Sequence, residues 1–200
     1  MRNTLCTLFL ILFLPVFGQE KDQSLAKTNV KNLLQDGSFE LPSGNKTAKG
    51  WLADVWDLKD DSAADLVGLF KLDTEKPDKG NYSQQVILLN ANGMPAVFTY
   101  LNLKKDCKYK LSFSIRQQGI LSGVYLLFRP SLKGGSRFLD PTGDYRGVNL
   151  KPGEDWTRYS FDFTAYCDDP KAQLIFMNFK SPGIFWLDDV CLIEVDTIGK

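Results

Sequence analysis

The stretch that decides the fold class is KYKLSFSIR, residues 108–116. Apolar and polar side chains alternate along it, and a period of two is typical of a β-strand with one buried side and one solvent-facing side. Residues 157–165, TRYSFDFTA, repeat the alternation with an aromatic residue at positions 159, 161 and 163. The two stretches therefore predict two half-buried strands of an antiparallel β domain.

The rest of the chain continues this pattern. Residues 97–103, VFTYLNL, alternate as well, but here aromatic residues also lie on the outward side. Shorter apolar runs predict further strands at residues 84–89, 123–129, 173–180 and 184–194, with turns rich in Gly, Pro and Asn between them. No stretch has the pattern of an amphipathic helix of three turns, and residues 62–72 are the candidate for a short one. The sequence therefore predicts an all-β, two-sheet antiparallel β-sandwich of about eight to ten strands.

The beginning of the chain has the features of a signal peptide. Arg2 precedes an apolar run at residues 8–17, and Val16 and Gly18 are small enough for a signal peptidase site, so cleavage is expected near Gly18. The run is shorter than the about 20 residues of a bilayer span. We expect a signal peptide at 1–18, a flexible segment at 19–30 and the sandwich at 31–200. The protein is then secreted, periplasmic or on the cell surface, without a transmembrane segment.

Composition excludes several classes of function. The chain has 24 basic and 24 acidic residues, so it lacks the basic field that a nucleic-acid partner requires. Histidine is absent, which excludes Ser-His-Asp and Cys-His nucleophilic sites and histidine-ligated metal centres. We therefore expect no nucleic-acid partner and no enzyme of these types.

Three cysteines follow the predicted signal peptide, at positions 107, 167 and 191. Cys107 precedes one predicted strand and Cys167 follows another. If those strands are antiparallel neighbours, a disulfide between Cys107 and Cys167 is one hypothesis. The alternative is that the cysteines serve as small buried apolar residues.

Several segments stand in an order that is known from a protein family. They are NLLQDGSFE at 32–40, GW at 50–51, GNYS at 80–83, KYKLSF at 108–113, WTRYSFDF at 156–163 and FWLDDV at 185–190. Together they resemble the carbohydrate-binding modules grouped around families 4, 9 and 22. The resemblance covers about residues 31–195 and implies a jelly roll of the galactose-binding-domain-like type, a fold that hosts many functions.

The resemblance also implies a structural calcium ion that clamps the N-terminal segment to the last strand. The matching carboxylates are Glu40 in the opening motif and Asp188 in the closing motif. Calcium prefers six to eight oxygen ligands, which carboxylates and backbone carbonyls supply. The alternative is that Asp188 and Asp189 end a strand in solvent.

A carbohydrate site needs exposed aromatic rings that stack on sugar rings and planar hydrogen-bonding groups beside them. In the related modules the ligand often lies across the concave sheet, and the outward-facing aromatic residues of 97–103 fit such a place. The candidate binding residues are Trp56, Tyr100, Phe98, Arg116, Tyr125, Arg129 and Trp51. For each tryptophan the alternative is a packing role in the core or at its rim.

These observations lead us to expect a secreted, non-catalytic carbohydrate-binding module whose partner is a poly- or oligosaccharide. One alternative is a structural or adhesive surface protein that binds another protein through the same aromatic residues. A less favoured alternative is a glycoside hydrolase or its accessory module, because acidic residues are plentiful. A single sandwich offers few deep clefts for catalysis.

Overall fold

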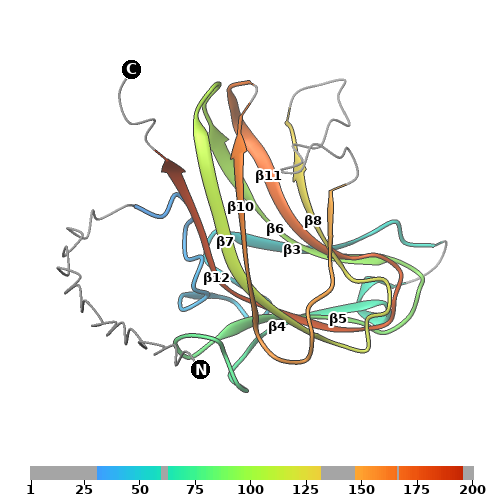
Figure 1. The fold of residues 1–200 in the computed structure, drawn as a ribbon. Helices are drawn as coiled ribbons and strands as arrows, with labels where there is room; N and C mark the ends of the chain where they lie inside the picture. Colours follow the sequence, from blue (N-terminus) through green and yellow to red (C-terminus); the bar gives the residue numbers. More distant parts are fainter. Residues whose placement is uncertain (1–30, 60–62, 132–146, 166, 196–200) are drawn as a thin grey trace, which may run out of the picture. The chain divides into compact units, whose positions relative to one another are not determined.

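The computed structural model describes residues 31–59, 63–131, 147–165 and 167–195. These residues form an all-β sandwich of two five-stranded sheets, so the predicted fold class is confirmed (Figure 1). The predicted signal peptide and the segment 19–30 lie outside the described residues. Among the residues that are described, no helix reaches the length and apolarity that a membrane span requires.

Each large sheet takes the name of a strand within it. The β7 sheet has the order β10 (Thr157–Thr164), β7 (Lys108–Gln118), β12 (Gly183–Val195), β5 (Ser83–Leu88) and β4 (Gly68–Asp73). The β6 sheet has the order β3 (Trp51–Trp56), β6 (Met94–Leu103), β11 (Asp169–Asn178), β8 (Val124–Arg129) and β9 (Val148–Leu150). All neighbours within these two sheets are antiparallel.

Two short elements complete the described chain. Strands β1 (Pro42–Ser43) and β2 (Thr47–Ala48) form a small antiparallel pair. Residues 62–72, the one candidate for a short helix, contain a single 3₁₀ turn, η1 (Ala64–Leu66), and then most of strand β4. Strand β4 forms because residues 68–73 pair with β5 along their whole length, and this nonlocal pairing outweighs local helix preference.

The apolar side chains of KYKLSFSIR face the core, and the polar ones between them face the outer side of the sheet. Tyr109, Leu111, Phe113 and Ile115 of β7 are at most 1% exposed and pack between the two sheets. β10 pairs with β7 in register, and its inward aromatic side chains stack on those of β7, with the ring centroids of Phe113 and Tyr159 5.7 Å apart. Burial of these rings supplies much of the hydrophobic stabilisation of the sandwich.

The opening motif attaches the N-terminal segment to β12. The Nδ2 group of Asn32 donates a hydrogen bond to the carbonyl of Val190 at 3.0 Å, and the N–H of Val190 donates to the carbonyl of Gly37 at 2.8 Å. A Cβ atom at Gly37 would lie 1.9 Å from the Val190 carbonyl oxygen. The glycine of this motif is therefore required by the close approach of two backbones.

The predicted disulfide is not formed, because Cys107, Cys167 and Cys191 are all free thiols. The strands β7 and β10 are antiparallel neighbours, as the hypothesis required. However, Cys107 lies at the start of β7, whereas Cys167 lies on the segment that leaves β10 for β11 in the other sheet. All three cysteines are half-buried and not buried, and of these Cys107 packs against the main core, as the alternative expects.

Candidate functional site

The outer side of the β6 sheet carries a row of aromatic side chains. In β6, Val97 and Leu101 point into the core, so Phe98 and Tyr100 point outward. The ring centroids of Trp56 and Phe98 are 5.6 Å apart, and those of Phe98 and Tyr100 are 6.2 Å apart. We call the outer side around Trp56, Phe98, Tyr100 and Tyr125 the aromatic face.

The rings of the aromatic face rest on an apolar cluster of their own. This cluster is separate from the main core and consists of Ala96, Phe98, Leu127, Ile175 and Met177, with Trp56, Met94 and Tyr125 packed against it. Phe98 is only 9% exposed, whereas Tyr100 is 53% exposed. The outer side of an antiparallel sheet is usually polar, so an apolar outer side with an exposed ring indicates a binding surface.

Polar side chains continue the aromatic face across the sheet. Tyr100 of β6 lies opposite Gln173 of β11, and Gln173 lies opposite Arg129 of β8. At another position, Asn149 of β9 donates a hydrogen bond from Nδ2 to the hydroxyl of Tyr125 at 3.3 Å. The structure thus brings together five of the predicted site residues, Trp56, Phe98, Tyr100, Tyr125 and Arg129.

The contribution of β11 was missed by the sequence analysis. Gln173, Ile175 and Met177 lie on the outer side, in the centre of the aromatic face. Residues 172–177 read AQLIFM, a nearly continuous apolar run, because both sides of this central strand are covered. Such a run signals burial on two sides but does not tell which alternate residues face which side.

Trp51 belongs to the core and not to the aromatic face. It is 2% exposed, its ring centroid lies 4.9 Å from that of Phe39, and its Nε1 group donates to the carbonyl of Asp36 at 3.1 Å. Trp51 stands at an odd position of β3, whereas Trp56 stands at an even one. The two tryptophans therefore point to opposite sides of the same strand, and the packing alternative holds for Trp51.

Arg116 also lies elsewhere, on the outer side of the β7 sheet. Its guanidinium carbon is 3.8 Å from the ring centroid of Trp186 and 5.3 Å from that of Trp156. Its Nη2 group donates to the carbonyl of Glu75 at 3.2 Å. Since β7 pairs with β10 and β12 and not with β6, Arg116 cannot join Tyr100. It holds residues 74–82, the segment between β4 and β5 that we call the strap.

The predicted calcium residues hold the same strap. The carboxylate of Glu40 accepts hydrogen bonds from the backbone N–H groups of Asn81 and Tyr82, at 2.8 and 3.0 Å. Burial alone would raise the pKa of Glu40, but these hydrogen bonds lower it below its usual range. One oxygen of Asp188 accepts the N–H groups of Asp78 and Lys79, both at 2.9 Å.

This region offers few free oxygen donors for a calcium ion. Within the described ranges, no group of three or more His, Cys, Asp or Glu side chains is arranged to hold a metal ion. The carboxylates of Glu40 and Asp188 are already bonded to N–H groups of the strap. Two such carboxylates do not make the six to eight oxygen ligands that calcium prefers. The described side chains of this region therefore do not by themselves fit a calcium ion, and the ion implied by the resemblance stays an untested prediction.

Asp188 is expected to make the protein less stable as the pH rises from about 4 to about 6. It is fully buried, and burial raises its pKa from 3.8 to about 6 despite hydrogen bonds from Lys79, Asp189 and Asp78. Between these pH values the folded state keeps a proton on Asp188 that the unfolded state releases. This proton adds up to about 3 kcal/mol to the free energy of unfolding. The added stability is lost as the pH rises and Asp188 is deprotonated in the folded state.

The measurement is urea denaturation of the wild type and of Asp188→Asn across this pH window. Asparagine stays neutral, so the wild type should lose stability relative to the variant as the pH rises. Other carboxylates titrate in both proteins and cancel in the comparison. A difference in unfolding free energy that does not change with pH would contradict the assignment of this pKa to Asp188.

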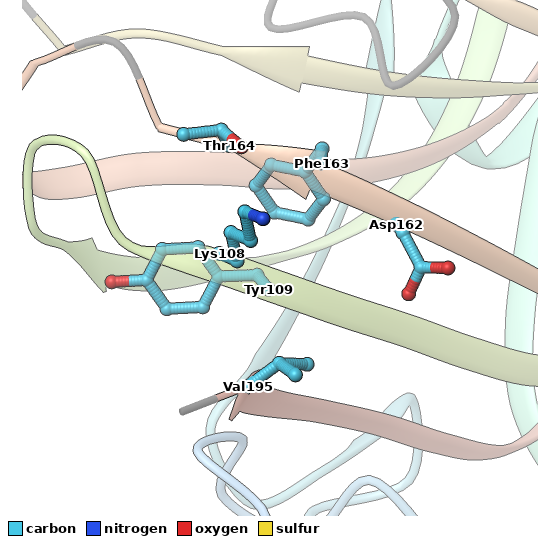
Figure 2. Close-up of a pocket in the computed structure, with 6 residues that line it drawn as sticks. All are labelled: Lys108, Tyr109, Asp162, Phe163, Thr164 and Val195. Atoms are coloured by element: carbon cyan, nitrogen blue, oxygen red, sulfur yellow. The ribbon is translucent and has the colours of Figure 1, made fainter. Parts of the chain in front are cut away.

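A hollow near the ends of β7, β10 and β12 is a second candidate site. Its lining is shown in Figure 2 and consists of Lys108, Tyr109, Asp162, Phe163, Thr164 and Val195. The rings of Tyr109 and Phe163 stack with centroids 5.5 Å apart, and Tyr109 is only 1% exposed. Its aromatic residues are thus engaged in the core, so the aromatic face is the better platform for a flat ligand.

The order of strands and the two packed sheets define the class of protein, a jelly-roll β-sandwich. No family model matches the chain, and no curated protein matches it. Several similar solved structures are carbohydrate-binding modules, so the likeness in fold to these modules is confirmed.

Three similar solved structures, one tailspike domain and two carbohydrate-binding modules, illustrate the likeness. The enzymatically active domain of bacteriophage CBA120 tailspike protein 4 has a TM-score of 0.61 and 12% identity, over 82% of this chain and 21% of that one. A CBM4 structure has a TM-score of 0.55 and 13% identity, over 81% and 99% of the two chains. TmCBM61 in complex with β-1,4-galactotriose has a TM-score of 0.52 and 16% identity, over 82% and 99%. This chain thus spans about a fifth of the tailspike domain and nearly all of the two modules.

Proposed function

We propose that the protein binds a poly- or oligosaccharide on the aromatic face and does not cleave it. The observation that carries the proposal is the ring of Tyr100, which is 53% exposed to solvent. It lies beside Phe98 and Trp56 on the outer side of the β6 sheet. Sugar rings present flat patches of C–H groups that stack on such rings. The likeness in fold to carbohydrate-binding modules, one of them in complex with galactotriose, supports the same ligand class.

The polar groups beside the rings suit binding better than hydrolysis. Gln173 supplies an amide and Arg129 a guanidinium, both planar groups that hydrogen-bond to sugar oxygens. Glycoside hydrolysis requires a pair of carboxyl groups placed on either side of the scissile bond. An amide and a guanidinium cannot supply the acid and the base of that reaction at neutral pH.

The proposal includes export of the protein, which rests on the predicted signal peptide alone.

Replacing Tyr100 or Trp56 by alanine is expected to weaken polysaccharide binding about tenfold or more, because each change removes a stacking surface. The measurement is affinity electrophoresis on a panel of soluble polysaccharides. The thermal midpoint should change little for Tyr100→Ala, since this ring is more than half exposed.

The matched control is Leu69→Ala, which removes a side chain of similar exposure, 41%, from β4 of the other sheet. It should leave retention on the polysaccharide unchanged. If the wild type is retained by no polysaccharide, the proposed function is wrong. Capture of a protein partner that depends on Tyr100 would then support the adhesive alternative.

A further inference from the structure

One row of side chains crosses the centre of the β6 sheet on its outer side. Tyr100, Gln173 and Arg129 stand directly opposite one another on the adjacent strands β6, β11 and β8. Adjacent strands lie about 4.8 Å apart, so the row places Arg129 roughly 10 Å from Tyr100 at the level of the backbone. A chain of sugars that stacks on Tyr100 and runs along this row therefore reaches Arg129 within a few units.

Arg129 differs from the other two described arginines in how its guanidinium is used. Arg116 lies over Trp186 and donates to the carbonyl of Glu75. Arg158 donates to the carbonyl of Asp189 at 3.0 Å and to the hydroxyl of Ser112 at 2.8 Å. Arg129 is exposed, and within the described part of the chain it has neither a hydrogen bond from its side chain nor an ion pair.

Among the described residues, no acidic group near the β6 sheet forms an ion pair with Arg129. Asp169, at the start of β11, accepts hydrogen bonds from the N–H groups of Ser131 at 2.7 Å and Lys171 at 3.0 Å. Asp54 lies on β3, the edge strand on the far side of β6 and β11 from β8. The positive charge of Arg129 thus stands at the end of the row, next to the stacking surface.

We infer that the ligand is an acidic polysaccharide and that Arg129 binds a carboxylate of one of its uronic acid units. This inference rests on the proposed function, since it assigns the substrate class of the same aromatic face. A guanidinium binds a carboxylate through two parallel N–H···O hydrogen bonds. An arginine with unused donors beside an aromatic ring gains this charged pair from an acidic glycan and not from a neutral one.

The test compares one polymer in two forms. Polygalacturonate and glucuronoxylan are each used as the acid and after chemical reduction of their carboxyl groups, and binding is measured by isothermal titration and affinity electrophoresis. The wild type is expected to bind at least one of the acids about tenfold more tightly than its reduced form. Raising the salt concentration should reduce this preference, because the contact is between exposed charges.

Variants separate the carboxylate contact from the stacking contact. Arg129→Gln is expected to lower affinity for the acid about tenfold and to lower affinity for the reduced polymer much less, because only the acid loses a charged pair as well as a hydrogen bond. Arg129→Lys should keep part of the preference, because it keeps the charge but not the paired donors. Tyr100→Ala should weaken binding to both forms. The thermal midpoint of each Arg129 variant should match that of the wild type, since the side chain is exposed.

The outcomes distinguish this inference from the proposed function. Equal binding of acid and reduced forms by the wild type, or an equal loss for both forms in Arg129→Gln, overturns the acidic ligand and leaves sugar binding intact. Binding to neutral polysaccharides and to no acidic one would likewise overturn the acidic ligand and leave sugar binding intact. Failure to bind any polysaccharide, acidic or neutral, overturns both.

Discussion

Replacing Trp51 by alanine is expected to lower the free energy of unfolding by about 4 kcal/mol, as for other large aromatic residues removed from a core. The side chain is 2% exposed and packs against Phe39 and Phe176, with centroid distances of 4.9 and 6.5 Å. The change also removes the Nε1 donor to the carbonyl of Asp36. It therefore leaves a cavity and weakens the attachment of the N-terminal segment.

Urea denaturation of Trp51→Ala, Trp51→Phe and Trp56→Ala checks this expectation. Trp51→Phe keeps a ring in the core but loses the hydrogen bond, so a cost of about 1–2 kcal/mol is expected. Trp56→Ala is the matched control, because it removes the same side chain from the outer side of the same strand. Equal destabilisation by the two alanine variants would contradict the division of β3 into a core side and a binding side.

Trp186→Ala is expected to lower the free energy of unfolding by a comparable amount, about 4 kcal/mol. Trp186 lies in β12 of the β7 sheet, whereas Trp51 lies in the β6 sheet. Trp186 is 6% exposed, and its Nε1 group donates to the carboxylate of Asp73 at 2.7 Å. Asp73 is 4% exposed, so loss of this donor leaves a buried carboxylate with fewer hydrogen bonds, from Gln85 and Lys71. Arg116 would also lose the ring over which it lies.

The same denaturation experiment, with polysaccharide retention measured in parallel, tests this second prediction. Trp186→Phe keeps a smaller aromatic ring under Arg116 and loses the N–H group, so it should cost about 1–2 kcal/mol, less than the alanine variant. Below the unfolding transition, both Trp186 variants should bind the polysaccharide as the wild type does. Loss of retention without loss of stability would move the binding site to the β7 sheet and contradict the proposed face.

The site was predicted only in part, because sequence neighbours are not always neighbours in a sheet. Tyr100 and Arg116 were predicted to belong to one binding site, and the short segment 104–107 joins their strands β6 and β7. In the structure this segment crosses from one sheet to the other, so the two residues lie on opposite outer sides of the sandwich. In contrast, β8 and β6 both pair with β11, which is distant in sequence, and this brings Tyr125 and Arg129 to the aromatic face.

By itself, the sequence determined that the protein is an antiparallel β-sandwich and which residues of KYKLSFSIR point into its core. That information is local, because a strand turns successive side chains to opposite sides whatever its partners are. Only the tertiary structure decided that Phe98, Tyr100, Gln173 and Arg129 share one surface, that Arg116 and the two predicted calcium carboxylates hold the strap, and that Trp51 is buried. Strand pairing depends on contacts between residues far apart in the chain, and a local period of two does not predict which strands make those contacts.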